Sequence, residues 1–270
     1  MKKTVALLAL VLWINAFGAL GGAARTAAPP PGSSAPAQLA AAGEDLIRLL
    51  PRSTIGVLVL DIRSLLEVDA IAKAMEKPEF KKLYNDFVKA SSIDPKRDVS
   101  YVGWGIPASA LSGLWSTPAS PVPFMDFAIV VGLRSKKARL QDLIKAMTSE
   151  AKEEEYHGVT IYSHLAGEGG STTPGVPAEA WKMMSFLFAL LDDSHLVLGD
   201  DQGVKSVIDV TRKKAEPLAK NSELIALLNG VDKSGFAWGG VSIPPELLKK
   251  GVETDPLFKA FEAVKGLAVA

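Results

Sequence analysis

The chain has 270 residues but no cysteine, only three histidines and an aromatic content of 7%. The lack of cysteine excludes a disulfide framework, a thiolate zinc site, an iron–sulfur cluster and a cysteine nucleophile. The 30 basic and 30 acidic residues leave no net charge, which argues against a nucleic-acid binder that depends on a basic surface. The hydrophobic fraction of 48% is too high for a disordered chain, so we expect a folded domain.

Residues 1–23 have the layout of a secretory signal peptide. Two lysines precede a long apolar stretch, and small residues follow at positions 21–24. We expect cleavage after Ala23 or Ala24 and export to the periplasm or the extracellular space, an oxidising setting that suits a chain without cysteine. The alternative is an uncleaved N-terminal membrane anchor, because residues 4–23 are about as long as a membrane span. No later apolar run approaches that length.

Residues 24–43 are predicted to be a linker. They are rich in proline and alanine, and the run Pro29–Pro31 followed by Gly32 cannot build a core. The remaining residues, 44–270, form the predicted domain. The chain stops soon after a predicted final strand that begins at Gly266, so we leave open whether residue 270 is the natural C-terminus.

Strand and helix patterns alternate along the predicted domain. We expect strands at residues 55–60, 99–106, 127–133, 156–163, 186–191, 195–198 and 235–243, and helices at 45–50, 62–75, 78–90, 136–151, 202–212 and 222–228. Such an alternation with short hairpins predicts an α+β fold, with a mainly antiparallel or mixed sheet and helices packed on one face.

Two stretches of the predicted domain resemble each other. Residues 44–125 and 186–250 each contain a strand, two helices and a closing strand in which an aromatic residue precedes a Trp-Gly pair. The pattern suggests an internal duplication and two related ferredoxin-like halves.

The sequence also resembles a group of exported bacterial proteins known only as a domain of unknown function. The similarity is carried by short motifs, namely Leu-Pro-Arg-Ser-Thr at 50–54, Asp-Pro-Lys-Arg-Asp-Val at 94–99, Tyr-His-Gly-Val-Thr-Ile-Tyr at 156–162, and residues 188–200 with their Asp-Asp pair and Leu-Val-Leu-Gly-Asp run. It covers most of residues 44–245. The resemblance implies no activity, because none is assigned to that group.

No catalytic or cofactor motif is found, so we expect no catalytic residue, metal or cofactor. His157 and His164 flank one predicted strand at an odd spacing, which places them on opposite faces and about 23 Å apart. His195 opens the neighbouring strand. The acidic pair at 192–193 is predicted to form a hairpin turn, and the pair at 200–201 to cap a helix.

Two segments of about 20 residues carry apolar side chains between predicted strands, and segments of that length are often functional. Residues 107–126 contain Leu111, Leu114 and Trp115, and residues 164–184 contain Trp181. We expect Trp115 and Trp181 either to contact a partner or to fold back over the domain's own core.

Three functions fit these features. The first is a non-enzymatic exported protein that binds an envelope protein or a membrane surface through Trp115 and Trp181, with Leu111 and Leu114 as supporting contacts. The second is an exported small-molecule-binding protein or hydrolase with a pocket between the two halves, in which His157, His195 and carboxylates converge. The third is a membrane-anchored accessory domain that retains its N-terminal helix. The oligomeric state is not predicted.

Overall fold

The computed structural model describes residues 35–91, 93–109, 127–134, 152–165, 185–233, 235–246 and 266–269. These residues form one nine-stranded sheet in the order β4-β5-β6-β7-β3-β2-β1-β8-β9, in which all neighbouring strands run antiparallel. The strands are β1 (Thr54–Leu60), β2 (Val99–Pro107), β3 (Ala128–Leu133), β4 (Lys152–Tyr156), β5 (Val159–Leu165), β6 (Ser185–Leu190), β7 (His195–Gly199), β8 (Ala237–Ser242) and β9 (Gly266–Val269).

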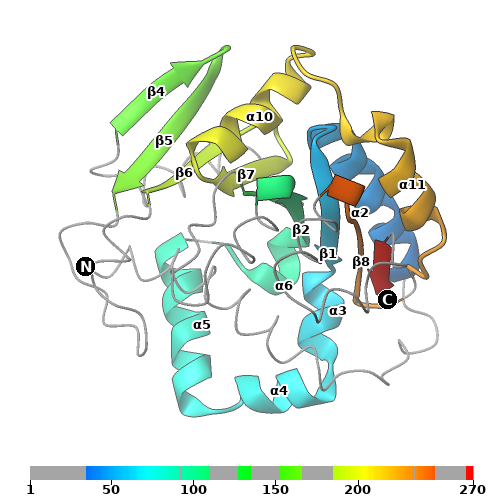
Figure 1. Ribbon diagram of the computed structural model, residues 1–270. Coiled ribbons are helices and arrows are strands. Elements are labelled where there is room, and N and C mark those ends of the chain that lie inside the picture. The colour runs from blue at the N-terminus through cyan, green and yellow to red at the C-terminus, as the bar shows by residue number, and fades with distance from the viewer. Residues whose placement is uncertain are drawn as a thin grey trace, which may run out of the picture.

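Helices cover both faces of this sheet. One face carries α2 (Ala35–Leu49), α10 (Asp201–Thr211), the short 3₁₀ helix η2 (Leu218–Lys220) and α11 (Ser222–Asn229). The other face carries α3 (Ile62–Glu67), α4 (Asp69–Met75), α5 (Pro78–Ser91) and α6 (Pro95–Asp98). In Figure 1, α10 crosses β6 and β7, whereas α3 to α6 form a separate group. The predicted α+β class is confirmed, but the helices are not restricted to one face.

Alternate residues of each strand therefore enter two separate cores. On β1, Val57 and Val59 pack under α2, and Leu60 lies with the opposite helices. All six residues of β3 are buried, because this central strand is covered on both sides. A strand that is covered on both faces needs apolar side chains on both faces, and its sequence is therefore a continuous apolar run.

The two stretches predicted to be duplicated are connected differently. In the first, β1 and β2 are neighbours and the helices between them pack on the α3 face. In the second, β7 and β8 are separated by β3, β2 and β1, and the helices between them pack on the α10 face. The sequence similarity between 44–125 and 186–250 therefore does not correspond to a repeated topology.

The folded region begins inside the predicted linker, because α2 starts at Ala35 rather than near residue 44. Leu46 and Leu50, one turn apart, are fully buried against the sheet, and Ala42 is buried as well. The predicted linker boundary at residue 43 is therefore wrong. The first turn of this helix holds Pro36 but no acidic residue, and proline is common in a first helical turn.

The single strand predicted at 156–163 is in fact a hairpin. His157 and Gly158 have φ angles of 51° and 74° and connect β4 to β5. Two successive residues with positive φ are typical of a type I′ turn, whose twist matches that of the flanking strands. The charged residues of β4 did not suggest a strand in the sequence. Four of the five residues of β4 are exposed. Charged side chains are typical of a sheet edge that must not pair with other chains.

The motif at 94–98 has a structural role. Asp94 caps α6 by accepting a hydrogen bond from the Lys96 backbone N–H, and the Tyr84 hydroxyl donates to the same carboxylate. Asp98, although buried, pairs with Arg97 at 2.9 Å. Among the residues described above, none of the helices is both long and apolar enough to cross a membrane.

Candidate functional site at one end of the sheet

Two long connections leave the sheet from the same end, which we call the loop end. It is the end at which β2 and β5 finish and at which β3 and β6 begin. Gly199 of β7 pairs with Ala128 of β3 on one side and with Leu187 of β6 on the other. The starts of β3 and β6 therefore lie about two strand spacings, or roughly 10 Å, apart. The connections 108–127 and 166–184 thus begin and end on one side of the molecule.

The residues predicted to bind a partner belong to these connections. Leu111, Leu114, Trp115 and Trp181 all lie outside the residues that the structure describes. Their positions relative to one another are therefore not part of the site geometry. What the structure fixes is the set of strand ends from which their segments leave.

A cavity of about 210 Å³ opens at the loop end. It lies between the end of α2, the start of β1, the end of β2, the start of β3 and the first turns of α10. Its polar lining consists of four hydroxyl side chains and one amide: Ser53, Thr54, Ser109, Ser206 and Gln202. Leu50, Pro51, Pro107 and Ala128 supply much of its apolar wall. Among the described residues, no charged side chain lines the cavity.

The rim of the cavity is held by the start of α10. Asp200 caps this helix by accepting a hydrogen bond of 2.7 Å from the Gly203 backbone N–H, as the sequence predicted for the 200–201 pair. The second carboxylate oxygen of Asp200 accepts from the Phe127 backbone N–H at 3.2 Å. A Cβ atom on Gly203 would lie 2.0 Å from the Phe127 carbonyl oxygen. Glycine is therefore required for this close approach of helix and chain.

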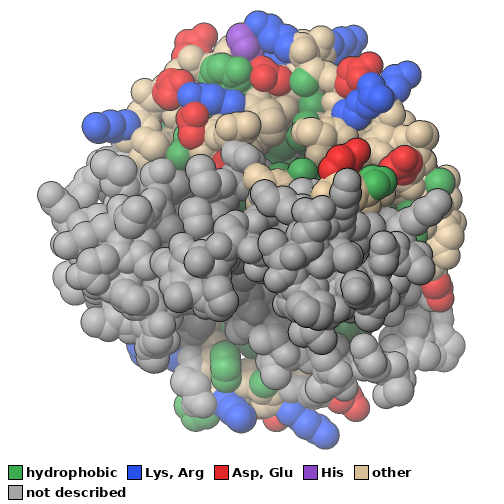
Figure 2. All heavy atoms as spheres, in the orientation of Figure 1, with side chains coloured by type: hydrophobic (Ala, Val, Ile, Leu, Met, Phe, Trp, Pro, Cys, Tyr) green, Lys and Arg blue, Asp and Glu red, His purple; other side chains and the backbone are tan. Residues whose placement is uncertain are grey.

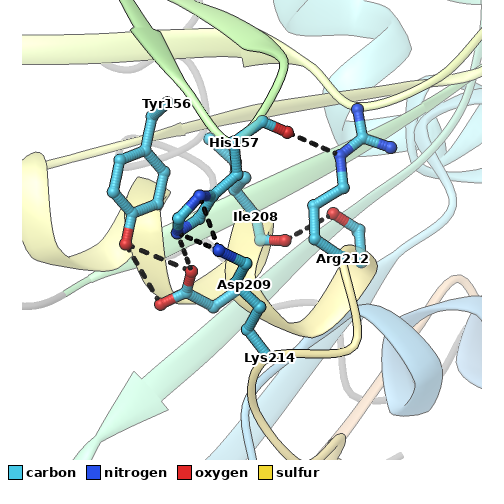
Figure 3. Close-up of polar contacts among 7 residues, drawn as sticks. Tyr156, His157, Ile208, Asp209, Arg212 and Lys214 are labelled. Atoms are coloured by element: carbon cyan, nitrogen blue, oxygen red, sulfur yellow. Dashed lines mark hydrogen bonds and ion pairs between the residues drawn. The ribbon is translucent and has the colours of Figure 1, made fainter.

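The opposite end of the sheet, which we call the histidine end, carries a network of charged groups (Figure 3). The Tyr156 hydroxyl donates to the Asp209 carboxylate at 3.1 Å, and Asp209 lies 3.4 Å from Nε2 of His157. Lys214 Nζ lies 2.8 Å from Nδ1 of the same ring. The same Nζ lies 3.2 Å from Nε2, so the lysine contacts both nitrogens of the ring.

Further contacts fasten the β4–β5 hairpin to α10. Arg212 Nε donates to the His157 carbonyl at 3.1 Å. Lys205 on α10 pairs with Glu154 of β4 at 3.1 Å and with Asp201 at 2.7 Å. Figure 2 shows charged side chains of both signs around a histidine at the top of the view, over this hairpin and the end of α10. The motif at 156–162 therefore belongs to a structural clamp that fastens the β4–β5 hairpin to α10.

The pKa of the Tyr156 hydroxyl is raised, first by desolvation and then by its hydrogen bond to Asp209. The hydroxyl therefore keeps its proton and acts as a donor within the clamp. Tyr156 thereby links the hairpin to Asp209 of α10.

A second cluster at the histidine end, separate from the first, surrounds His195. Its Nδ1 lies 2.8 Å from Asp192, and its Nε2 lies 3.6 Å from Asp45 of α2. Asp192 also accepts a hydrogen bond from the Ser194 backbone N–H at 2.7 Å, as expected for a hairpin turn. Burial opposes ionisation of Asp192, but the Ser194 N–H and the His195 ring outweigh it and lower its pKa.

Tyr101 of β2 reaches this cluster across the sheet. Its ring lies over Gly132 of β3, where a Cβ atom would come within 2.1 Å of it, and its centroid is 6.4 Å from that of His195. The Tyr101 hydroxyl is buried and has no hydrogen-bond partner within the described part of the chain. Burial raises the pKa of this hydroxyl, and the nearby carboxylates of Asp45 and Asp192 add to the effect.

The catalytic alternative required His157, His195 and carboxylates to converge on a pocket. The structure places the two histidines in separate clusters at the histidine end, and none of their carboxylate partners lines the cavity. His157 lies in a turn and His164 within β5, so they do not flank one strand. Among the described residues, no group of three or more His, Asp or Glu side chains has the geometry to hold a metal ion.

The cavity residues could not have been found from the sequence. Thr54, Gln202 and Ser206 come from two distant segments, and isolated hydroxyl and amide residues carry no spacing signal. The turn at His157-Gly158 did carry one signal, because glycine adopts the positive φ found at Gly158 without strain.

Comparisons with known proteins do not identify a family for this chain. The chain matches no family model, no curated protein and no solved structure. The resemblance to exported proteins of unknown function therefore stays a prediction.

Proposed function

We propose that this chain is an exported, non-enzymatic protein that binds an envelope partner through the segments at the loop end. Trp115 and Trp181 are the proposed anchors, and Leu111 and Leu114 the supporting contacts. The compartment is the periplasm or the cell surface, reached through the predicted signal peptide at residues 1–23.

One observation carries the proposal. The two segments that contain the tryptophans leave from the same end of one antiparallel sheet, from strands roughly 10 Å apart. A single partner can contact both segments at that spacing, since a standard interface spans about 800 Å² on each protein. The strands beneath are well anchored, because Ala128 and Leu187 are buried. Aromatic side chains on loops held by a rigid scaffold are a common binding arrangement.

The charge distribution favours the loop end over the histidine end as the contact surface. The ionic and hydrogen-bonding groups around His157 are occupied within the chain by Tyr156, Asp209 and Lys214. Breaking these contacts to bind a partner would leave partly buried charges without their counter-charges. Among the described residues, no charged side chain lines the cavity, and Asp200 at its rim is engaged by the Gly203 and Phe127 backbone N–H groups.

Site-specific photocrosslinking tests the proposal. A photoreactive phenylalanine is placed at position 115, at position 181, or at the exposed Lys213 of the histidine end as the control. We expect positions 115 and 181 to crosslink the same envelope component in intact cells and position 213 to crosslink none. Different partners at 115 and 181, or equal crosslinking from 213, would contradict the proposal.

A substitution experiment complements the crosslinking. Trp115→Ala with Trp181→Ala should abolish capture of that component, while the Lys213→Ala control retains it. Circular dichroism checks that the double variant keeps its fold. N-terminal sequencing of the exported protein tests the export step, with cleavage expected after Ala23 or Ala24 and an intact N-terminus expected for the anchored alternative.

A further inference from the structure

We propose that His195 forms a pH-sensitive latch, which holds helix α2 on the sheet more tightly when its imidazole ring is protonated. The latch consists of His195, Asp192 in the β6–β7 turn and Asp45 of α2. This inference goes beyond the proposed partner and does not depend on it. It rests on the position of a carboxylate at each ring nitrogen and on the two separate elements that these carboxylates belong to.

Each ring nitrogen of His195 faces a different carboxylate. Nδ1 lies 2.8 Å from Asp192, which belongs to the same hairpin. Nε2 lies 3.6 Å from Asp45, which belongs to α2 and is distant along the chain. Only 16% of the histidine side chain is exposed, so solvent screens a charge on the ring only in part. A charge on this ring therefore acts on both carboxylates at short range.

The protonation state of the ring decides how many of these contacts are favourable. A neutral imidazole has a single N–H group, so one of its two nitrogens presents a lone pair to a carboxylate. The imidazolium has an N–H group at both nitrogens and a positive charge, so it attracts Asp192 and Asp45 together. Histidine changes its charge between about pH 5 and pH 8, where carboxylates are normally ionised. The latch should therefore be tight at the acid end of this range and loose at the alkaline end.

The surroundings of Asp192 support this attraction. Burial opposes the ionisation of Asp192, but the Ser194 backbone N–H and the His195 ring outweigh it and lower its pKa. Opposite charges at this distance favour the charged form of both groups. Asp192 also accepts a hydrogen bond from the His195 backbone N–H at 2.9 Å, so the turn itself holds this carboxylate against the ring. Asp45 is then the partner whose contact depends on the position of α2.

Other neighbours of the ring come from the turn, β2 and β3. The residue of β3 that pairs with His195 is Gly132, which carries no charge. Tyr101 of β2 lies 6.4 Å from the histidine between ring centroids and stays neutral, because burial raises the pKa of its hydroxyl. Asp193 in the turn adds a negative charge. Arg134, which follows β3 at this end of the sheet, is exposed, so solvent screens its charge.

The contact at Asp45 differs in kind from the apolar packing of the α2 segment. Leu46 and Leu50 are fully buried and lie against β2, and apolar contacts of this type do not change with pH. Leu50 also lines the cavity at the loop end, so this segment extends from the latch to the cavity. Protonation of His195 thus acts on the docking of α2 through Asp45.

Hydrogen exchange of the full chain tests the proposal. The backbone amides of α2 around Asp45 are measured at about pH 5.5 and about pH 8, with each rate corrected for the intrinsic effect of pH. The ratio of protection between the acid and the alkaline sample should be about threefold larger in the unmodified protein than in Asp45→Asn, as expected for one partly exposed ion pair. His195→Gln should lower this ratio to the same extent. Sodium chloride at about 1 M should reduce the effect, since salt screens such a pair.

Two matched variants show whether the effect belongs to the latch. Glu44→Gln removes the neighbouring carboxylate of α2, which pairs with Arg48 within the helix, and should leave the pH effect unchanged. His157→Gln removes the other histidine of the histidine end, whose ring contacts Asp209 of α10, and should leave it unchanged as well. A merely structural role of His195 would lower the protection of α2 equally at both pH values.

Three results would overturn the proposal. The first is that Asp45→Asn retains the full pH effect of the unmodified protein. The second is that Glu44→Gln or His157→Gln reduces the effect as much as Asp45→Asn does. The third is that His195→Gln lowers the protection of α2 equally at both pH values. If His195→Gln fails to fold, the comparison of Asp45→Asn with Glu44→Gln decides alone. None of these results bears on the proposed partner, whose crosslinks at positions 115 and 181 are measured separately.

Discussion

The two ends of the sheet are held together by different kinds of contact. The histidine end is held by charged and titratable groups, such as the contacts of His157 with Asp209 and Lys214. The loop end is held by the close approach of Gly203 to Phe127 and by the Asp200 cap, next to a cavity whose described polar lining is neutral. The charges of one end fix a hairpin in place, whereas at the other end the Asp200 cap joins the start of α10 to the backbone of Phe127. The comparison teaches that histidines and carboxylates that stand out in a sequence can serve to fix the fold.

The largest expected effect tests the packing of the loop end. Gly203→Ala would place a methyl group 2.0 Å from the backbone carbonyl of Phe127, which cannot move aside as a side chain could. We expect a loss of about 3 kcal/mol in the free energy of unfolding. The sign is the opposite of the usual helix effect, in which alanine is about 1 kcal/mol better than glycine. Urea unfolding measures it, and Gln202→Ala on the same helix is the control, with a change within about 0.5 kcal/mol.

The corresponding substitution at the histidine end should cost less. Gly132→Ala would bring a methyl group to 2.1 Å from the ring of Tyr101, which is a side chain and can shift. We expect a loss of about 2 kcal/mol. A double-mutant cycle with Tyr101→Val isolates the clash, because removal of the ring should relieve most of the cost of Gly132→Ala. Strict additivity of the two single changes would show that the clash is not the cause.

A matched pair of tyrosines sharpens the comparison within the histidine end. Tyr101→Phe removes a buried hydroxyl that has no partner among the residues the structure describes, so we expect a gain of about 1 kcal/mol. Tyr156→Phe removes a hydroxyl that donates to Asp209, so we expect a loss of about 1 kcal/mol. Thermal unfolding of both variants gives the two signs. If both substitutions changed the stability in the same direction, the two hydroxyls would be in equivalent surroundings.

The smallest effect concerns pH. Because the pKa of Asp192 is lowered in the folded protein, its contribution to stability is present above the unfolded value of about 3.9 and is lost as the pH falls through the folded value. Asp192→Asn should therefore lower stability at neutral pH and flatten the dependence of stability on pH below about 4. Urea midpoints between pH 2 and 7 measure this, with the exposed Glu153→Gln as the control. An unchanged slope in the acid range would contradict it.

Much of the local structure could be predicted from the sequence. The apolar runs gave the central strands to within one or two residues, and Asp200 was correctly placed as a helix cap. The hairpin turn at 192–193 was predicted as well, because Asp-Asp-Ser interrupts two apolar runs. These features depend on neighbours in the sequence, which is why a local pattern suffices.

The features that the sequence did not reveal depend on distant contacts. The strand β4 consists mainly of charged residues, and only its pairing with β5 makes it a strand. The break between α3 and α4 at Val68, which is extended with a ψ of 125°, interrupts an apolar pattern that predicted one continuous helix. The cavity likewise forms only where α2, three strands and α10 meet. Residues such as Thr54 become notable only through that meeting.

The strand order also determines when this protein can fold. β1 lies near the start of the folded region, yet its two neighbours are β2 and β8, and Val57 pairs with Gly240. Contacts across such a long sequence separation form slowly, because a large loop must close first. Until residues near 240 are available, one edge of β1 has no partner and can pair with another chain. A fragment that lacks the last third of the chain should therefore aggregate rather than fold as a smaller domain.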